Sequence, residues 1–93
     1  MDAKILRRVE LPDGQGAVTL YDWMAIDVRD GRNLIRTDEA GTEMWRATPV
    51  SGPEDCFTSL SWSGVALTAH TWSCYCVAVD LRDGSVTVLE FTK

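Results

Sequence analysis

Short alternations of apolar and polar residues, separated by glycine-containing turn signals, run along the whole chain. The turn signals lie at 13–16, 29–31, 39–41, 51–53, 63–64 and 82–84. The runs between them are rich in Val, Ile, Thr, Tyr, Phe and Trp, which fit a pleated, half-buried sheet. Turns that recur about every ten residues leave no room for helices of ordinary length, so the pattern predicts an all-β chain.

This pattern predicts nine short strands, and within the first of them residues 3–10 could instead form two turns of helix. The predicted strands are 3–11, 16–22, 24–28, 32–38, 43–47, 56–62, 65–71, 73–81 and 85–92. The last hairpin has the clearest pattern. Tyr75, Val77 and Val79 share one face of a strand with period 2, and Asp83 and Gly84 then turn the chain back.

We expect residues 1–93 to form a single domain built from two pseudo-repeats, 3–47 and 56–93, joined by a polar linker at 48–55. Residues 16–23 (GAVTLYDW) resemble 64–72 (GVALTAHTW), and 38–41 (DEAG) resemble 80–84 (DLRDG), each with one residue inserted. Offsets of this size are typical of propeller repeats with four strands per blade. A competing alignment matches 26–31 with 79–84, and the two alignments exclude each other.

Residues 33–45 resemble the repeat of quinoprotein-type (PQQ-like) β-propellers. In that family a strand ends in Asp, turns at Gly and returns to a Trp four positions later, and Asp38, Gly41 and Trp45 follow this order. The second copy keeps Asp80 and Gly84 but has Val88 where Trp would stand. The chain is also similar to small bacterial proteins of unknown function that share the stretch at 71–75 (TWSCY) and a terminal Phe-Thr-Lys, a likeness that implies no activity.

The propeller resemblance implies four-stranded antiparallel blades, with the Trp packed between neighbouring blades. A quinone cofactor does not follow, because a propeller binds it on the axis of a closed ring and two blades make no ring. Two such sheets can each bury one face by packing together. The expected fold is therefore all-β, with two propeller-blade-like antiparallel four-stranded sheets packed as a small sandwich, and no cofactor.

The net charge of the chain limits the classes of molecule that it is expected to bind. Lys and Arg number 9 against 14 Asp and Glu, a formal charge of −5, and the basic cluster of Lys4, Arg7 and Arg8 is flanked by acids. This balance disfavours nucleic acid as a partner.

No run approaches the roughly 20 apolar residues that cross a bilayer, and charges interrupt residues 1–8 where a signal peptide is apolar. We expect a cytoplasmic protein with reduced thiols and no membrane partner.

Cys56, Cys74, Cys76 and the single histidine, His70, are the candidates for metal or thiol chemistry. Cys-x-Cys within a strand is not the spacing of a zinc knuckle. His70 and Cys74 would lie about 13 Å apart on one strand, which leaves Cys56 as the cross-strand partner of His70. We therefore interpret the thiols as small buried apolar residues and assign no catalytic, cofactor-binding or metal residue.

Four tryptophans are the least ordinary feature of the composition, and Trp23, Trp45, Trp62 and Trp72 are the candidate interface or packing residues. The leading hypothesis is a non-enzymatic interaction protein that binds an unidentified protein or small ligand. Open sheet edges pair unless they are blocked, which predicts a homodimer formed through an edge or a Trp-containing face. The alternatives are an acidic inhibitor or immunity-type protein for a basic toxin, and a cryptic metal or thiol enzyme.

Overall fold

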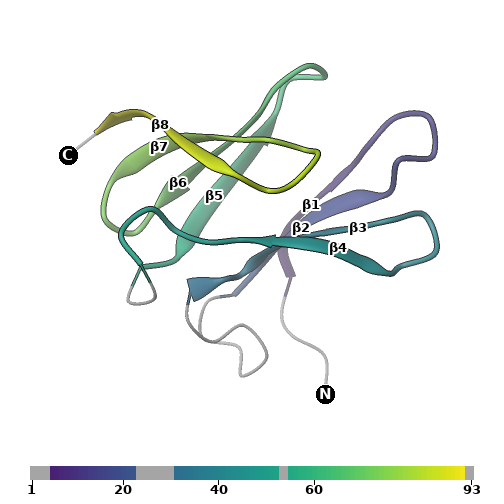
Figure 1. The fold of residues 1–93 in the computed structure, drawn as a ribbon, viewed down its shortest axis with the longest axis horizontal. Helices are drawn as coiled ribbons and strands as arrows, with labels where there is room; N and C mark the ends of the chain where they lie inside the picture. Colours follow the sequence, from purple (N-terminus) through teal and green to yellow (C-terminus); the bar gives the residue numbers. More distant parts are fainter. Residues whose placement is uncertain (1–4, 23–30, 53–54, 92–93) are drawn as a thin grey trace.

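The computed structural model describes residues 5–22, 31–52 and 55–91, which form two four-stranded antiparallel sheets (Figure 1). The first sheet holds β1 (Ile5–Glu10), β2 (Ala17–Tyr21), β3 (Leu34–Thr37) and β4 (Glu43–Ala47). The second holds β5 (Phe57–Trp62), β6 (Leu67–Thr71), β7 (Tyr75–Val79) and β8 (Val86–Phe91). The all-β prediction is confirmed, and residues 5–10 form a strand rather than a helix. The predicted strand 24–28 lies outside the described residues.

Both sheets have the same simple topology, with spatial order β1-β2-β3-β4 in one and β5-β6-β7-β8 in the other. Asp38 and Gly41 form the β3–β4 turn, where Asp38 Oδ1 accepts the N–H groups of Ala40 and Thr42 at 2.9 Å. Asp80 and Gly84 occupy the equivalent β7–β8 turn. The competing alignment would match Gly31, which precedes β3, with Gly84, so it joins positions that are not equivalent in the two sheets.

Each of the four edge strands carries one β-bulge, whereas the central pairs β2–β3 and β6–β7 are regular. The extra residue is Leu6 in β1, Met44 in β4, Thr58 in β5 and Leu89 in β8. A bulge twists an edge and interrupts its row of free hydrogen-bonding groups. The edges of both sheets are therefore less open to strand addition than regular edges would be.

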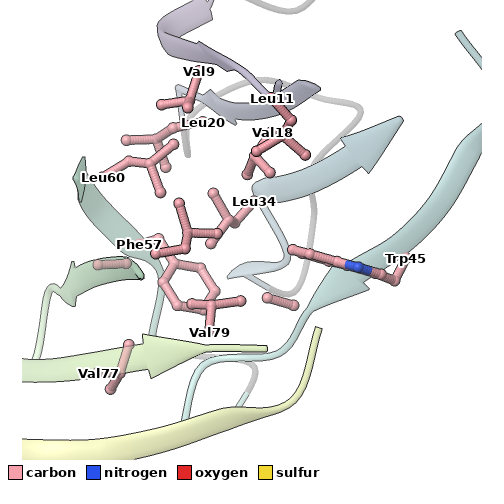
Figure 2. Close-up of a cluster of buried hydrophobic side chains, with 13 residues drawn as sticks. Val9, Leu11, Val18, Leu20, Leu34, Trp45, Phe57, Leu60, Val77 and Val79 are labelled. Carbon is pink, nitrogen blue, oxygen red and sulfur yellow. The ribbon is translucent and has the colours of Figure 1, made fainter. Parts of the chain in front are cut away.

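The core lies between the two sheets, with β5 packed against β1 and β2. Phe57 is fully buried at its centre, between Leu34 of the first sheet and Val79 of the second (Figure 2). The other core residues are Val9, Leu11, Val18, Leu20, Trp45, Ala47, Leu60, Leu67, Ala69 and Val77. The shortest dimension of the molecule, 19 Å, suits two layers packed about 10 Å apart. The fold is a small β-sandwich.

Two polar residues tie the sheets together across this core. The Asn33 amide is fully buried, donates to the Tyr21 and Phe57 carbonyls at 2.8 Å, and accepts the Phe57 N–H at 2.9 Å. The Arg36 guanidinium donates to the Leu81 carbonyl and, at 3.0 Å, to the Gln15 carbonyl. Polar groups removed from water are costly unless they are bonded, so both residues restrict how the sheets can dock.

Across residues 5–22, 31–52 and 55–91, no helix has the length and apolar character needed to span a membrane.

Candidate binding surface on the second sheet

Strand β8 continues the inner face of the second sheet beyond the part that the first sheet buries. Its Val88 pairs with Val77 and its Phe91 with Tyr75, so both face the core side. Val77 is fully buried, but Val88 is 45% exposed and Phe91 56% exposed. Val88, Phe91 and the bulge residue Leu89, which is 55% exposed, are the exposed large apolar residues of this edge strand and are here called the β8 strip.

The β8 strip has a defined local geometry. The Tyr75 and Phe91 rings lie with their centroids 5.1 Å apart and their planes tilted by 52°, a favourable aromatic arrangement. Glu90 is the only charged residue of β8, and its pairing with Cys76 places it on the opposite face of the sheet. Val88 and Phe91 therefore lie on the face opposite the one charged residue of the strand.

A second feature of this sheet is the β6–β7 turn, which the buried Asp55 holds in place. The Asp55 carboxylate is 5% exposed and accepts the Cys56 N–H at 2.8 Å, the Ser73 N–H at 3.1 Å and the Ser73 hydroxyl at 2.5 Å. The Ser73 hydroxyl also lies 3.1 Å from the Ser51 hydroxyl. Asp55 lies in the segment between the two sheets, and its hydrogen bonds connect that segment to the β6–β7 turn.

Cys74 completes that turn in the left-handed region, with φ of 74°, a conformation that side chains other than Gly, Asn and Asp rarely adopt. Its N–H donates to the Thr71 carbonyl at 3.0 Å, and the Tyr75 N–H donates to the Thr71 hydroxyl at 3.2 Å. These bonds hold the strained residue in place. The turn presents Trp72, 68% exposed, at the end of the sheet.

The outer face of the second sheet carries a row of four reactive or polar side chains, one from each strand. The strand pairings align Ser59, His70, Cys76 and Glu90. Ser59 and His70 are hydrogen-bonded, with 2.9 Å between Oγ and Nδ1. Directly opposed residues have Cβ atoms about 4.5–5.5 Å apart, so His70 and Cys76 are neighbours.

The family model described as Domain of unknown function (DUF7957) matches residues 2–91. The chain belongs to the DUF7957 family. No curated protein and no solved structure matches it. The description of the family names no activity, so we infer the function of this DUF7957 domain from its own surfaces.

The thiols and the histidine do not gather into one site. Cys76, and not Cys56, lies opposite His70, because β6 ends at Thr71 and a turn containing Cys74 separates it from β7. Burial, and then the neighbouring Asp55 carboxylate, raise the pKa of the half-buried Cys56 thiol above its ordinary value. Within the described part of the chain, no group of three or more His, Cys, Asp or Glu residues is placed to hold a metal ion.

The tryptophans divide between packing and exposure. Trp45 is buried in the core, and its Nε1 donates to the Leu81 carbonyl of the second sheet at 2.8 Å. Trp62 is half-buried against the core, and Trp72 is exposed. Trp23 lies outside the described residues. The β8 strip and the His70–Cys76 pair were missed by sequence reasoning, because both depend on the register between strands.

Proposed function

We propose that this DUF7957 domain is a non-enzymatic interaction protein that forms a homodimer through the β8 strip. The observation that carries the proposal is the exposure of Val88, Leu89 and Phe91 on one edge strand. Exposed apolar residues that adjoin one another mark interaction surfaces, whereas scattered ones need no explanation. The other exposed large apolar residues of the described chain are the adjacent Ile5 and Leu6 of β1, and Met44, Val50, Val65 and Trp72, which lie on separate strands and turns.

The bulge at Leu89 favours contact between faces over addition of a strand to the edge. It interrupts the regular row of backbone groups that strand addition requires. In a two-fold dimer the same patch meets itself, so an uncharged apolar patch is self-complementary. Glu90 points to the outer face and is kept away from its counterpart in the second copy. A second copy therefore fits the strip without opposing like charges.

The size of the strip sets the strength of the dimer. Full burial of a Val, Leu or Phe side chain contributes about 1.5–3 kcal/mol, so three half-exposed side chains on each copy offer about 5–9 kcal/mol in total. Association itself costs about 4–15 kcal/mol in lost motion. At its most favourable, about 5 kcal/mol net, this balance predicts a weak dimer with a Kd of about 0.2 mM or above, rather than an obligate one.

Sedimentation velocity over a range of protein concentrations tests the dimer. The wild-type chain should pass from 10.3 kDa towards twice that mass as concentration rises. Leu89→Ser and Phe91→Ser should keep it monomeric. Val65→Ser is the matched control, since Val65 is 88% exposed in the distant β5–β6 turn and should leave dimerisation unchanged. A wild-type chain that stays monomeric at every concentration up to about 1 mM would refute the proposal.

The second candidate function, an inhibitor or immunity-type protein for a basic toxin, is supported by the gathering of acidic turns. Arg36 bonds to carbonyls in the β1–β2 and β7–β8 turns, and Gly14 lies against Glu39 of the β3–β4 turn. Asp13, Asp38, Glu39, Asp80 and Asp83 therefore lie in neighbouring turns. Such an acidic end would bind a basic protein in a salt-dependent way.

Neutralisation of a toxin encoded beside this chain tests the second candidate. Asp80→Asn with Asp83→Asn should weaken binding, most clearly at low salt, whereas Phe91→Ser should not. Binding that ignores the acidic turns and is lost with Phe91→Ser would instead identify the β8 strip as the contact surface.

A further inference from the structure

We propose that Asp13 is a modification site, at which the Asp13–Gly14 peptide rearranges spontaneously to isoaspartate. The inference rests on a comparison within the chain, because the same dipeptide occurs at Asp83–Gly84 in a turn that the fold holds closed. It does not depend on the β8 strip or on dimerisation. The third Asp-Gly dipeptide begins at Asp30, which lies outside the described residues.

The rearrangement needs only the chain itself and water. The Gly14 nitrogen attacks Cγ of the protonated Asp13 carboxyl group, a new C–N bond forms, and the proton of the nitrogen leaves with the carboxyl OH as water. Water then opens the five-membered imide. Cleavage of the new bond restores aspartate. Cleavage of the original peptide bond leaves the chain running through the side chain, with a carboxylate in place of the main-chain carbonyl. Glycine favours ring closure because no Cβ atom hinders its nitrogen.

The Asp13–Gly14 turn leaves both reacting groups free. Both residues are exposed and lie in the left-handed region, with φ of 59° and 72°. Among the described residues, neither the Asp13 carboxylate nor the Gly14 N–H has a hydrogen-bond partner. A Cβ atom on Gly14 would meet only the end of the exposed Glu39 side chain, 3.0 Å from Oε2. Ring closure therefore requires neither group to give up a hydrogen bond.

The Asp83–Gly84 turn holds the same two groups in place. The Gly84 N–H donates to the Asp80 carbonyl at 2.8 Å, and Asp83 Oδ1 accepts the Ser85 N–H at 2.9 Å. The bond from Ser85 lowers the pKa of Asp83, which disfavours the protonated carboxyl group that the reaction needs. Gly84 is buried, and a Cβ atom on it would lie 2.6 Å from the Trp45 indole. Its nitrogen can attack only after this turn opens.

Isoaspartate at position 13 alters the joint between the sheets without altering the net charge, since one carboxylate replaces another. It adds a methylene group to the main chain shortly before Gln15, whose carbonyl accepts Arg36 Nη2 at 3.0 Å. Gly16 follows, and a Cβ atom on it would lie 2.0 Å from the Thr37 carbonyl oxygen, so this segment packs closely on β3. The longer turn displaces these groups, and Arg36 loses one of its two carbonyl partners.

Ageing of the wild-type chain tests the site. Folded protein is kept at pH 7 and body temperature for several weeks, and isoaspartate is located by a tryptic map. Trypsin yields the peptides 9–29, 30–32 and 83–93, so the three Asp-Gly dipeptides are read separately. Isoaspartate directly after a cleavage site is also sought on the uncleaved peptide. We expect it to form about tenfold or more faster at Asp13 than at Asp83, because two hydrogen bonds must break before Asp83 reacts.

Ageing in urea isolates the contribution of the fold. With both turns unfolded, Asp13 and Asp83 should react at similar rates. In folded protein, Asp13→Glu should abolish isoaspartate in peptide 9–29, because a glutamate would have to close a larger ring, and the matched variant Asp83→Glu should leave it unchanged. Equal rates at Asp13 and Asp83 in folded protein, or a difference that persists in urea, would overturn the proposal.

The stability of the modified chain is a separate readout. The isoaspartate form is isolated from aged protein by chromatography, and its urea midpoint should lie below that of unaged protein. The decrease should be smaller in Arg36→Met, which has no guanidinium to lose the Gln15 carbonyl. A modified chain as stable as the unaged one would show that the turn absorbs the added methylene, and would overturn the inferred effect on the joint between the sheets.

Discussion

Two glycines at the same turn position have different roles, because one of them lies against the other sheet. Gly41 and Gly84 both adopt positive φ, 88° and 77°, in the equivalent turns β3–β4 and β7–β8. A Cβ atom on Gly41 would meet nothing within 4 Å. A Cβ atom on Gly84 would lie 2.6 Å from Cε3 of Trp45. Gly84 therefore lets the second sheet approach the Trp45 indole closely.

Gly84→Ala should lower the free energy of unfolding by about 2–4 kcal/mol, from left-handed strain plus collision with the indole. Gly41→Ala is its control, because it introduces the strain alone and should cost about 1–2 kcal/mol. Urea unfolding followed by circular dichroism measures both. If both substitutions lowered the free energy of unfolding by the same amount, the Trp45 indole would be able to move away from the added methyl group without loss of stability.

At the scale of single elements, the β6–β7 turn depends on a residue outside it. Asp55 precedes β5, yet its carboxylate satisfies two N–H groups and one hydroxyl around the turn. Bonds to a buried charged acceptor contribute more than neutral ones, and loss of the acceptor leaves the donors unpaired. The strained Cys74 is therefore held by a group that lies 19 positions earlier in the chain.

Asp55→Ala should lower the free energy of unfolding by about 2–4 kcal/mol and release the turn before the rest of the sheet. Hydrogen exchange should show lost protection at the amides of Cys56 and Ser73, with the β2–β3 amides still protected in proportion to global stability. Glu39→Ala is the control, since Glu39 is an exposed turn residue outside the left-handed region. Uniform loss of protection across both sheets would contradict a local role for Asp55.

The strands were predictable because their signals are local, whereas the surfaces were not. Period-2 alternation and glycine turns identify β7 and β8 without knowledge of any other element. The bulges at Leu6 and Leu89, and the opposition of His70 and Cys76, depend on pairing between strands, which a single sequence does not display. The likeness of residues 33–45 to a quinoprotein repeat stays a prediction.

At the scale of the whole molecule, the described parts of the two sheets are joined by apolar packing and by hydrogen bonds from the side chains of Asn33, Arg36 and Trp45. Asn33 bonds both sheets through its amide, which satisfies backbone groups of Tyr21 and Phe57 that would otherwise lie unpaired in the core. Apolar packing alone tolerates sliding of one sheet on the other, but directional bonds do not. Asn33 therefore contributes to the uniqueness of the sandwich as well as to its stability.

Asn33→Ala should lower the free energy of unfolding by about 2–4 kcal/mol, since it removes the partner of two buried backbone groups of Phe57 and one half-buried carbonyl of Tyr21. Gln15→Ala, which shortens an exposed amide side chain, should change it by less than about 0.5 kcal/mol. Chemical denaturation measures both. A cost for Asn33→Ala below about 1 kcal/mol would mean that water replaces the lost bonds.

Arg36 also connects the two sheets by hydrogen bonds, but unlike Asn33 it carries a charge whose burial opposes the stability that those bonds contribute. It is 8% exposed, its Nε atom has no hydrogen-bond partner, and among the described residues no carboxylate pairs with it. Its two bonds to carbonyls contribute about 1.5–3 kcal/mol each, but burial of an unpaired charge with an unsatisfied donor costs a comparable amount. The Leu81 carbonyl also keeps the Trp45 Nε1 donor when Arg36 is removed.

Arg36→Met should therefore change the free energy of unfolding by no more than about 1–2 kcal/mol, because methionine fills similar space without a buried charge. Arg36→Lys should cost more, about 2–4 kcal/mol, since an ammonium group keeps the charge but lacks the planar fork that reaches both carbonyls. Chemical denaturation of both variants and of wild type gives their free energies of unfolding, and the expected order is the lysine variant below the methionine variant. A lysine variant more stable than the methionine variant would show that the positive charge itself, and not the reach of the guanidinium, stabilises the joint between the sheets.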